Sequence, residues 1–164
     1  MDPQACHSQL ARMLADETTL LGLLEQQLQR EHALLVANDV EGLEQAADAR
    51  QGSIVTLSRL DQDRRGLCRL LGQSADQIGL AALLKWCDPS GTLTVAHAAA
   101  SRQAQLCREQ NDRNGALVNA RLNRLNGMLD MLNGSHASSR TYGSGGAKRS
   151  PTTPPAGRMV SVSA

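Results

Sequence analysis

Residues 10–35 read LARMLADETTLLGLLEQQLQREHALL, and four leucines in this stretch lie seven residues apart. They are Leu14, Leu21, Leu28 and Leu35. Apolar residues that recur every three or four positions share one face of an α-helix, and a seven-residue repeat is typical of helices that pack side by side. Glu17 and Glu31 occupy the alternate positions of this repeat. The pattern predicts an amphipathic helix over about residues 4–37.

A second helix is predicted from Val40 to about Leu71. Asn38 or Asp39 can cap its start, and Gly72 is a natural stop at its end. Its apolar residues keep the helical spacing and are Leu43, Ala47, Ile54 and Leu57, followed by Leu60, Leu67 and Leu71. Because so few residues join two helices of this length, we expect a long antiparallel hairpin.

Two further helices are predicted after the hairpin. The segment 74–87, SADQIGLAALLKWC, resembles a short helix, with Ser74 and Gln77 at capping-box spacing. We expect Trp86 to pack this helix onto the hairpin. A turn at 88–91 then leads into a third long helix, from Thr92 or Thr94 to Leu132, which closes at 133–134. The predicted fold is all-α, an elongated helical bundle over residues 1–134.

The chain changes character after residue 134. Residues 135–164 are rich in Ser, Gly, Thr and Pro and show no helical spacing, which predicts a flexible, disordered tail. Four of the 17 basic residues and none of the 16 acidic ones lie in this tail, so the bundle itself is mildly acidic. Tyr142, followed by Gly143, is the lone aromatic residue of the tail. An isolated aromatic in a polar, flexible segment is typical of a docking motif.

Composition argues against several classes of protein. Aromatic residues make up 1% of the chain, and an acidic bundle with so few rings disfavours nucleic-acid binding. No apolar run has the length of a signal peptide or a membrane span, so we expect a cytoplasmic protein that does not insert into membranes. The four cysteines, at 6, 68, 87 and 107, are far apart and form no CxxC pair. We therefore expect them to be core residues and predict no metal site and no cofactor.

Asparagines crowd the third long helix, although asparagine is a poor residue for a helix interior. At 100° per residue the apolar side chains form one face of this helix, and most of the asparagines lie along one edge of that face. Asn114 lies within the apolar face itself. The amides can bond to neighbouring helices, border a groove for a partner helix or extended peptide, or form plain surface. The sequence alone leaves these three interpretations open.

No residue pattern supports a catalytic site. His97 lies on a predicted bundle helix, as the histidine of a phosphotransfer protein does. The residues that follow it, AAASRQ, lack the lysine and glycine usual at such a site, and a solvated or packed histidine fits better. We therefore predict that the chain is not an enzyme.

The order of these parts resembles the FlgN family of flagellar export chaperones. The resemblance is carried by Asn111-x-x-Asn114-Gly115-x-Leu117, by the spaced leucines up to Leu132, and by Tyr142-Gly143-x-x-Gly146. It covers most of the chain. The family usually has an aspartate before the last glycine of the tyrosine motif, where this chain has Ser144 and Gly145 in the middle.

The resemblance implies a cytoplasmic, substrate-specific chaperone of the flagellar type III export system. Its clients would be the two hook–filament junction (hook-associated) proteins, held by their C-terminal helical regions, most simply one client per chaperone monomer. Client contact would fall on the third long helix, at Asn111, Asn114, Leu117, Val118, Leu122, Leu125 and Leu129. Tyr142 with Gly143 would dock on the cytoplasmic domain of the export gate.

Two other classes remain as alternatives. A structural coiled-coil protein would associate with itself through the leucine repeat of the first helix. A histidine phosphotransfer protein would carry the phosphoryl group on His97.

Overall fold

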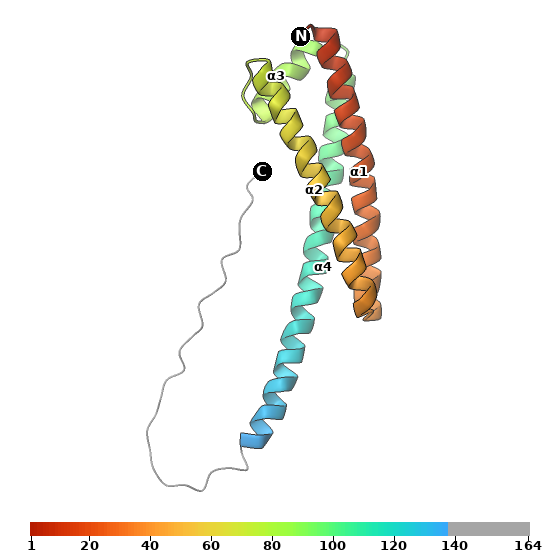
Figure 1. Ribbon diagram of the computed structural model, residues 1–164, viewed down its shortest axis with the longest axis vertical. Helices are drawn as coiled ribbons and strands as arrows, with labels where there is room; N and C mark the ends of the chain where they lie inside the picture. The colour runs from red at the N-terminus through yellow and green to blue at the C-terminus, as the bar shows by residue number, and fades with distance from the viewer. Residues whose placement is uncertain (138–164) are drawn as a thin grey trace, which may run out of the picture. The chain divides into compact units, whose positions relative to one another are not determined.

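The computed structural model describes residues 1–137, with side chains described as far as Asn133. This part of the chain forms four α-helices and no strand: α1 (Pro3–Ala37), α2 (Val40–Leu70), α3 (Gln77–Cys87) and α4 (Thr92–Ala137) (Figure 1). The all-α fold expected from the sequence is confirmed. No helix among the described residues is both long enough and apolar enough to cross a membrane.

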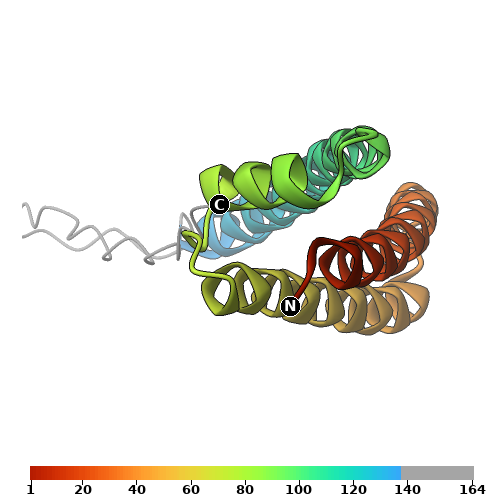
Figure 2. The same ribbon diagram turned by 90° about the horizontal axis from the view of Figure 1, so that it is seen from above.

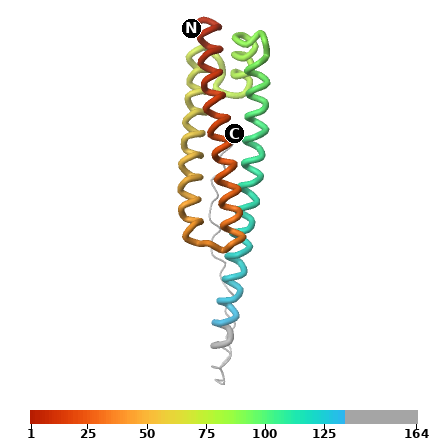
Figure 3. The backbone as a smooth tube through the Cα atoms, turned by 90° about the vertical axis from the view of Figure 1, so that its right-hand side faces the viewer, coloured from red at the N-terminus to blue at the C-terminus, as the bar shows by residue number. Residues whose placement is uncertain are grey.

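The chain divides into two units, Met1–Leu125 and Asn126–Ala164. In the first unit α1 and α2 form the expected antiparallel hairpin, and the α4 part of this unit runs beside α1 (Figure 3). α3 lies at the end of this unit where α1 begins and α2 ends (Figure 2). Residues 126–137 of the second unit continue α4. The boundary expected at residue 134 stays a prediction.

Two residues form the hairpin turn: Asn38 ends α1 and Asp39 starts α2. Asn38 adopts the left-handed conformation, with φ 60°, and its backbone N–H bonds to the last carbonyls of α1. Asp39 caps α2, because its side chain accepts a hydrogen bond from the backbone N–H of Gly42 at 3.0 Å. Of the two candidate caps from the sequence, Asp39 is therefore the one that starts α2.

Three expectations about helix ends and exposure were wrong. Asp76, not Ser74, caps α3 by accepting from the backbone N–H of Gly79 at 2.9 Å, while the Ser74 hydroxyl donates to Asp76. Trp86, expected to pack α3 onto the hairpin, is 46% exposed and belongs to neither cluster of buried side chains. α4 continues to Ala137, past the expected stop at 133–134, because a glycine inside a helix lowers its stability without ending it.

The core of the first unit consists of two clusters of buried side chains. One joins α3 to the start of α1 and the end of α2, and its buried members are Cys6, Leu10, Leu14, Leu67, Cys68, Leu80, Leu83, Leu84, Cys87 and Leu93. The other joins α1 to α4 and contains Leu21, Leu24, Leu28, Ala100 and Cys107. All four cysteines are buried and free, as expected from the sequence. Burial raises the pKa of Cys6 to about 12, with Cys87 adding to the shift.

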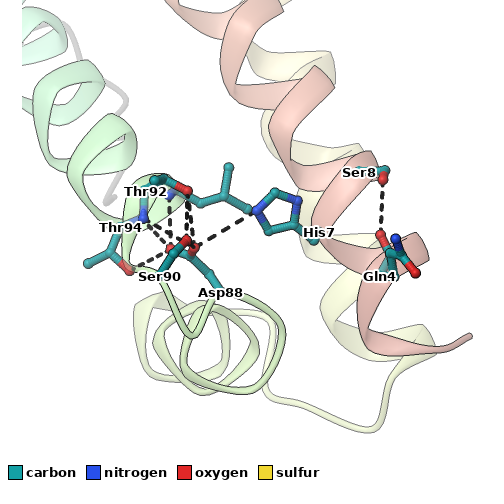
Figure 4. A network of polar contacts seen from close by, with 8 residues as sticks. Gln4, His7, Ser8, Asp88, Ser90, Thr92 and Thr94 are labelled. Atoms are coloured by element: carbon teal, nitrogen blue, oxygen red, sulfur yellow. Dashed lines mark hydrogen bonds and ion pairs between the residues drawn. The ribbon is translucent and has the colours of Figure 1, made fainter.

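Asp88 fixes the start of α4. Its carboxylate accepts hydrogen bonds from the backbone N–H groups of Thr92, Leu93 and Thr94, at 3.1, 2.9 and 3.0 Å. His7 of α1 places its Nε2 atom 3.9 Å from the same carboxylate (Figure 4). Burial opposes ionisation, but these hydrogen bonds hold the pKa of Asp88 below its usual value. The backbone N–H groups at the start of α4 thus find their hydrogen-bond acceptor in Asp88, close to His7 of α1.

Contacts along α1 and α4 show that these two helices run parallel. Cys107 lies against the backbone oxygen of Leu21, and Asn114 against that of Leu28, seven residues further along both helices. On α4 the residues at this spacing, Leu93, Ala100, Cys107 and Asn114, are all buried. The same side of α4 therefore faces α1 over three successive heptads.

Candidate partner-binding surface

The packed part of α4 ends at a buried polar network around Asn114. The Asn114 side chain is 2% exposed. Its Nδ2 atom donates to the backbone oxygen of Leu28 at 2.9 Å and to Glu31 Oε2 at 3.3 Å. Its Oδ1 atom lies 3.0 Å from Nδ1 of His32, which donates in this arrangement. Both sides of the amide are therefore satisfied by α1.

Arg50 of α2 completes this network. Its guanidinium donates to Asn111 Oδ1 at 2.6 Å and lies 3.7 Å from Glu31 Oε1. Glu31 is buried, so the cation of Arg50 and the amide of Asn114 together compensate its charge. The network thus links α1, α2 and α4 in one layer. For Asn111 and Asn114 the structure selects the first of the three interpretations, bonding to neighbouring helices.

The expectation that Asn114 contacts a partner directly therefore needs correction. Its amide is enclosed by α1, so in this conformation no partner reaches it. Asn111 is half-buried, and its oxygen is occupied by Arg50. His32 and Arg50, which help to hold the two asparagines, were not singled out from the sequence, and Glu31 was noted only for its place in the leucine repeat. The signal available for them was a charged residue at a buried position of the α1 leucine repeat, namely Glu31.

Immediately after this network the apolar side of α4 becomes exposed. Four residues of the first unit form this exposed region: Leu117 (36% exposed), Val118 (40%), Leu122 (51%) and Leu125 (56%). We call them the α4 surface. At 100° per residue they fall within about 140° of the helix circumference, on the side that Cys107 and Asn114 occupy further up the helix. This side loses its neighbours because α1 ends at Ala37 and α2 begins at Val40.

Arg121 lies in the middle of the α4 surface. It follows Asn114 by seven residues and is half-buried. Its guanidinium donates to Asn38 Oδ1 in the hairpin turn, at 3.3 Å. α1 has no basic residue in its own last turn, so Arg121 also brings a positive charge to the negative end of that helix. Within residues 1–137 no carboxylate lies within ion-pair distance of Arg121.

The remaining asparagines of α4 differ from Asn111 and Asn114. Asn119 and Asn123 are exposed, and neither makes a side-chain hydrogen bond within the described part of the chain. Both lie outside the packed face, so the second and third interpretations, groove edge or plain surface, stay open for them.

The described part of the second unit carries apolar side chains of its own. Met128, Leu129, Met131 and Leu132 are between 45% and 77% exposed, and Asn126 and Asn133 are exposed as well. Leu129, which the sequence assigns to client contact, is 56% exposed. Tyr142 and Gly143, the expected docking motif, lie outside the described residues.

His97 is held in a polar setting between helices. It is half-buried, and its Nε2 atom accepts from Arg64 of α2 at 3.4 Å. Arg64 also lies 3.9 Å from Glu17 of α1 and pairs with Asp61. Burial and the charge of Arg64 both lower the pKa of His97, which favours a neutral ring. A neutral histidine bonded to an arginine is a structural arrangement that the sequence did not indicate.

The described residues form a helical bundle with an exposed apolar surface on α4, an arrangement typical of helical proteins that bind a partner. The chain belongs to the FlgN family: the family model described as FlgN protein matches residues 6–150. It is accordingly a flagellar export chaperone of the type III export system. No curated protein and no solved structure matches the chain significantly.

Proposed function

We propose that this chaperone binds the C-terminal helical regions of the hook–filament junction (hook-associated) proteins and delivers them to the flagellar export gate. The observation that carries the proposal is the α4 surface, where a helix-packing face continues past the end of the hairpin. A helix of a client is the natural occupant of such a face, because the same side of α4 already packs against a helix further up.

The free energies expected for burial and association fit reversible binding of a client. Fully burying one exposed leucine or valine side chain stabilises a complex by about 1.5–3 kcal/mol. The four residues of the α4 surface are already partly covered, and association costs on the order of 4–15 kcal/mol. Client binding therefore needs further contacts, for which Leu129 is the nearest candidate from the sequence assignment. A chaperone that must release its client at the gate requires such moderate affinity.

Asn111 and Asn114 enter this proposal as residues that hold α4 in place. Their bonds to Arg50 and to α1 lie directly before the α4 surface. A change at either residue alters how α4 leaves the hairpin and so affects client binding indirectly. Delivery is assigned to the tail, where Tyr142 and Gly143 dock on the cytoplasmic domain of the gate while the helices keep the client. The proposal includes a cytoplasmic location and a monomeric chaperone that holds one client.

The coiled-coil alternative receives no support from a specific observation. It needs the leucine repeat of α1 for self-association, and these leucines are 1–5% exposed within the chain. The phosphotransfer alternative needs an accessible His97, whereas this ring is half-buried against Arg64. Neither alternative is therefore preferred to the chaperone function.

Calorimetric titration tests the proposal. The purified full chain is titrated with the C-terminal segments of the two hook–filament junction proteins. We expect one-to-one binding with a negative heat-capacity change, the mark of buried apolar surface. Absence of binding to both segments, by a chain whose circular dichroism shows intact helices, would remove this function.

A further inference from the structure

We propose that Arg121 selects the occupant of the α4 surface: an amphipathic helix that carries one carboxylate among its apolar side chains, with which Arg121 pairs. This inference rests on the proposed function, because it states which feature of a client helix the surface recognises. It is carried by the position of Arg121, by the charges around it and by the continuity of the surface with the α1–α4 packing.

Position is the first argument. Arg121 occupies the place that follows Leu93, Ala100, Cys107 and Asn114 at seven-residue spacing, and each of those four side chains is buried against neighbouring helices. A helix that extends this packing beyond the end of α1 therefore covers Arg121 too. A covered guanidinium without a carboxylate partner is costly, so the occupant must supply one.

The stretch of α4 around Arg121 carries positive charge and no negative charge. Between Arg113 and Leu129 the chain has three arginines and no acidic residue. The nearest acidic residues on α4, Asp112 and Asp130, each lie nine positions from Arg121, about 180° around the helix. In the hairpin turn, the carboxylate next to Asn38 in sequence is that of Asp39, and this carboxylate caps α2. Within the described residues, the hydrogen-bond partner of the Arg121 side chain is the neutral Asn38 Oδ1 atom, at 3.3 Å. The α4 surface is thus apolar and positively charged, and its complement is apolar and acidic.

The same charges disfavour a second copy of this chain as the occupant. Two α4 surfaces face to face would bring arginines together without a carboxylate on either side, which is destabilising at an interface. Val118 and Leu125 lie three and four positions from Arg121 on the helix, and a long aliphatic stem lets an arginine cover such apolar neighbours while its guanidinium reaches a carboxylate.

A pair of synthetic peptides tests this inference without a natural client. Both peptides are helical with a leucine heptad repeat, and they differ only in one central residue, glutamate or glutamine. We expect the full chain to bind the glutamate peptide on the order of tenfold more tightly, and we expect added salt to shrink this difference. In the Arg121→Gln variant the two peptides bind equally.

Arg124→Gln is the matched control. Arg124 is exposed, lies at the rim of the α4 surface, and its loss removes the same charge. We expect this variant to keep the preference for the glutamate peptide. Equal binding of both peptides to the unmodified chain overturns the inference. Loss of the preference in the Arg124 variant also overturns it, because the overall positive charge of the region would then explain the preference without a specific pair at Arg121.

A second arm uses the C-terminal client segments. If these bind the unmodified chain, Arg121→Gln weakens them about tenfold, and replacing one client carboxylate by its amide has no further effect in that variant. If they bind both chains equally, the inference fails and the proposed function stands. If the client segments bind neither the unmodified chain nor the variant, while the preference for the glutamate peptide holds, the proposed function fails and the inference stands. Arg121-dependent binding to phosphatidylglycerol vesicles, or Arg121-dependent dimerisation in sedimentation, would replace the acidic helix by another occupant and overturn the inference.

Discussion

The side-chain amide of Asn114 on α4 donates a hydrogen bond to the backbone oxygen of Leu28 on α1, over 2.9 Å. Leu28 belongs to the leucine repeat of α1, and Asn114 is the last buried residue of the corresponding repeat on α4. This bond therefore marks the point at which the closed core gives way to the exposed α4 surface. Residues on either side of it are expected to respond differently to substitution.

Replacing Asn114 by alanine should destabilise the fold. The change leaves the buried carboxylate of Glu31 and the half-buried ring of His32 without this partner, which costs about 1–3 kcal/mol. Urea unfolding followed by circular dichroism measures this. Asn119→Ala is the control, because the exposed amide makes no side-chain bond within residues 1–137, and we expect a change within about 0.5 kcal/mol. Equal effects of the two substitutions would contradict the role given to the network.

Leu125→Asp should abolish client binding and leave the helices intact. The leucine is 56% exposed, so a carboxylate there is tolerated in the free chain, but a bound client would bury the charge beside apolar side chains. We expect affinity for the C-terminal client segments to fall at least about tenfold in calorimetry. Val95→Asp is the control, since Val95 is 69% exposed on another side of α4. Unchanged client affinity in a folded Leu125 variant would refute the assignment of this surface.

Tyr142→Ala should separate docking from client binding. If the tail acts independently, the variant keeps its affinity for client segments and loses affinity for the purified cytoplasmic domain of the export gate. Tyr142→Phe keeps the ring and should retain most of the docking, because the anchor is apolar contact with an aromatic side chain. Loss of both interactions to the same extent would argue against a separate docking motif.

Acidification should destabilise the fold through His97. Its pKa is lowered in the folded chain, so the unfolded chain binds a proton more readily, and stability falls as the pH drops below the usual histidine value of 6.5. Melting temperatures between about pH 7 and pH 5.5 record this loss. In His97→Gln the amide oxygen still accepts from Arg64 but does not titrate, so the decline should be smaller. An identical decline in both proteins would exclude His97 as its source.

The sequence by itself determined the helices of this protein. The spacing of Leu14, Leu21, Leu28 and Leu35 comes from the period of the α-helix, and the turn at Asn38 and Asp39 follows from local capping, so both were readable without neighbours. The family was likewise identified from motifs between Asn111 and Gly146, and the match over residues 6–150 confirms it. Contacts between residues distant in the chain were not readable in this way.

Only the tertiary structure decided which side chains those helices cover. Ser53 is buried and Ile54 is 39% exposed, against the predicted apolar stripe of α2, because burial depends on where α1 and α4 lie and not on hydrophobicity alone. Trp86 is 46% exposed for the same reason. The helical pattern sets Asn114 within the apolar face of α4, but only the structure shows that α1 encloses it, whereas Leu125 on the same side of α4 is 56% exposed because α1 has ended. The length of α1 relative to α4 sets that difference, and a neighbour's length is a property of the packed molecule.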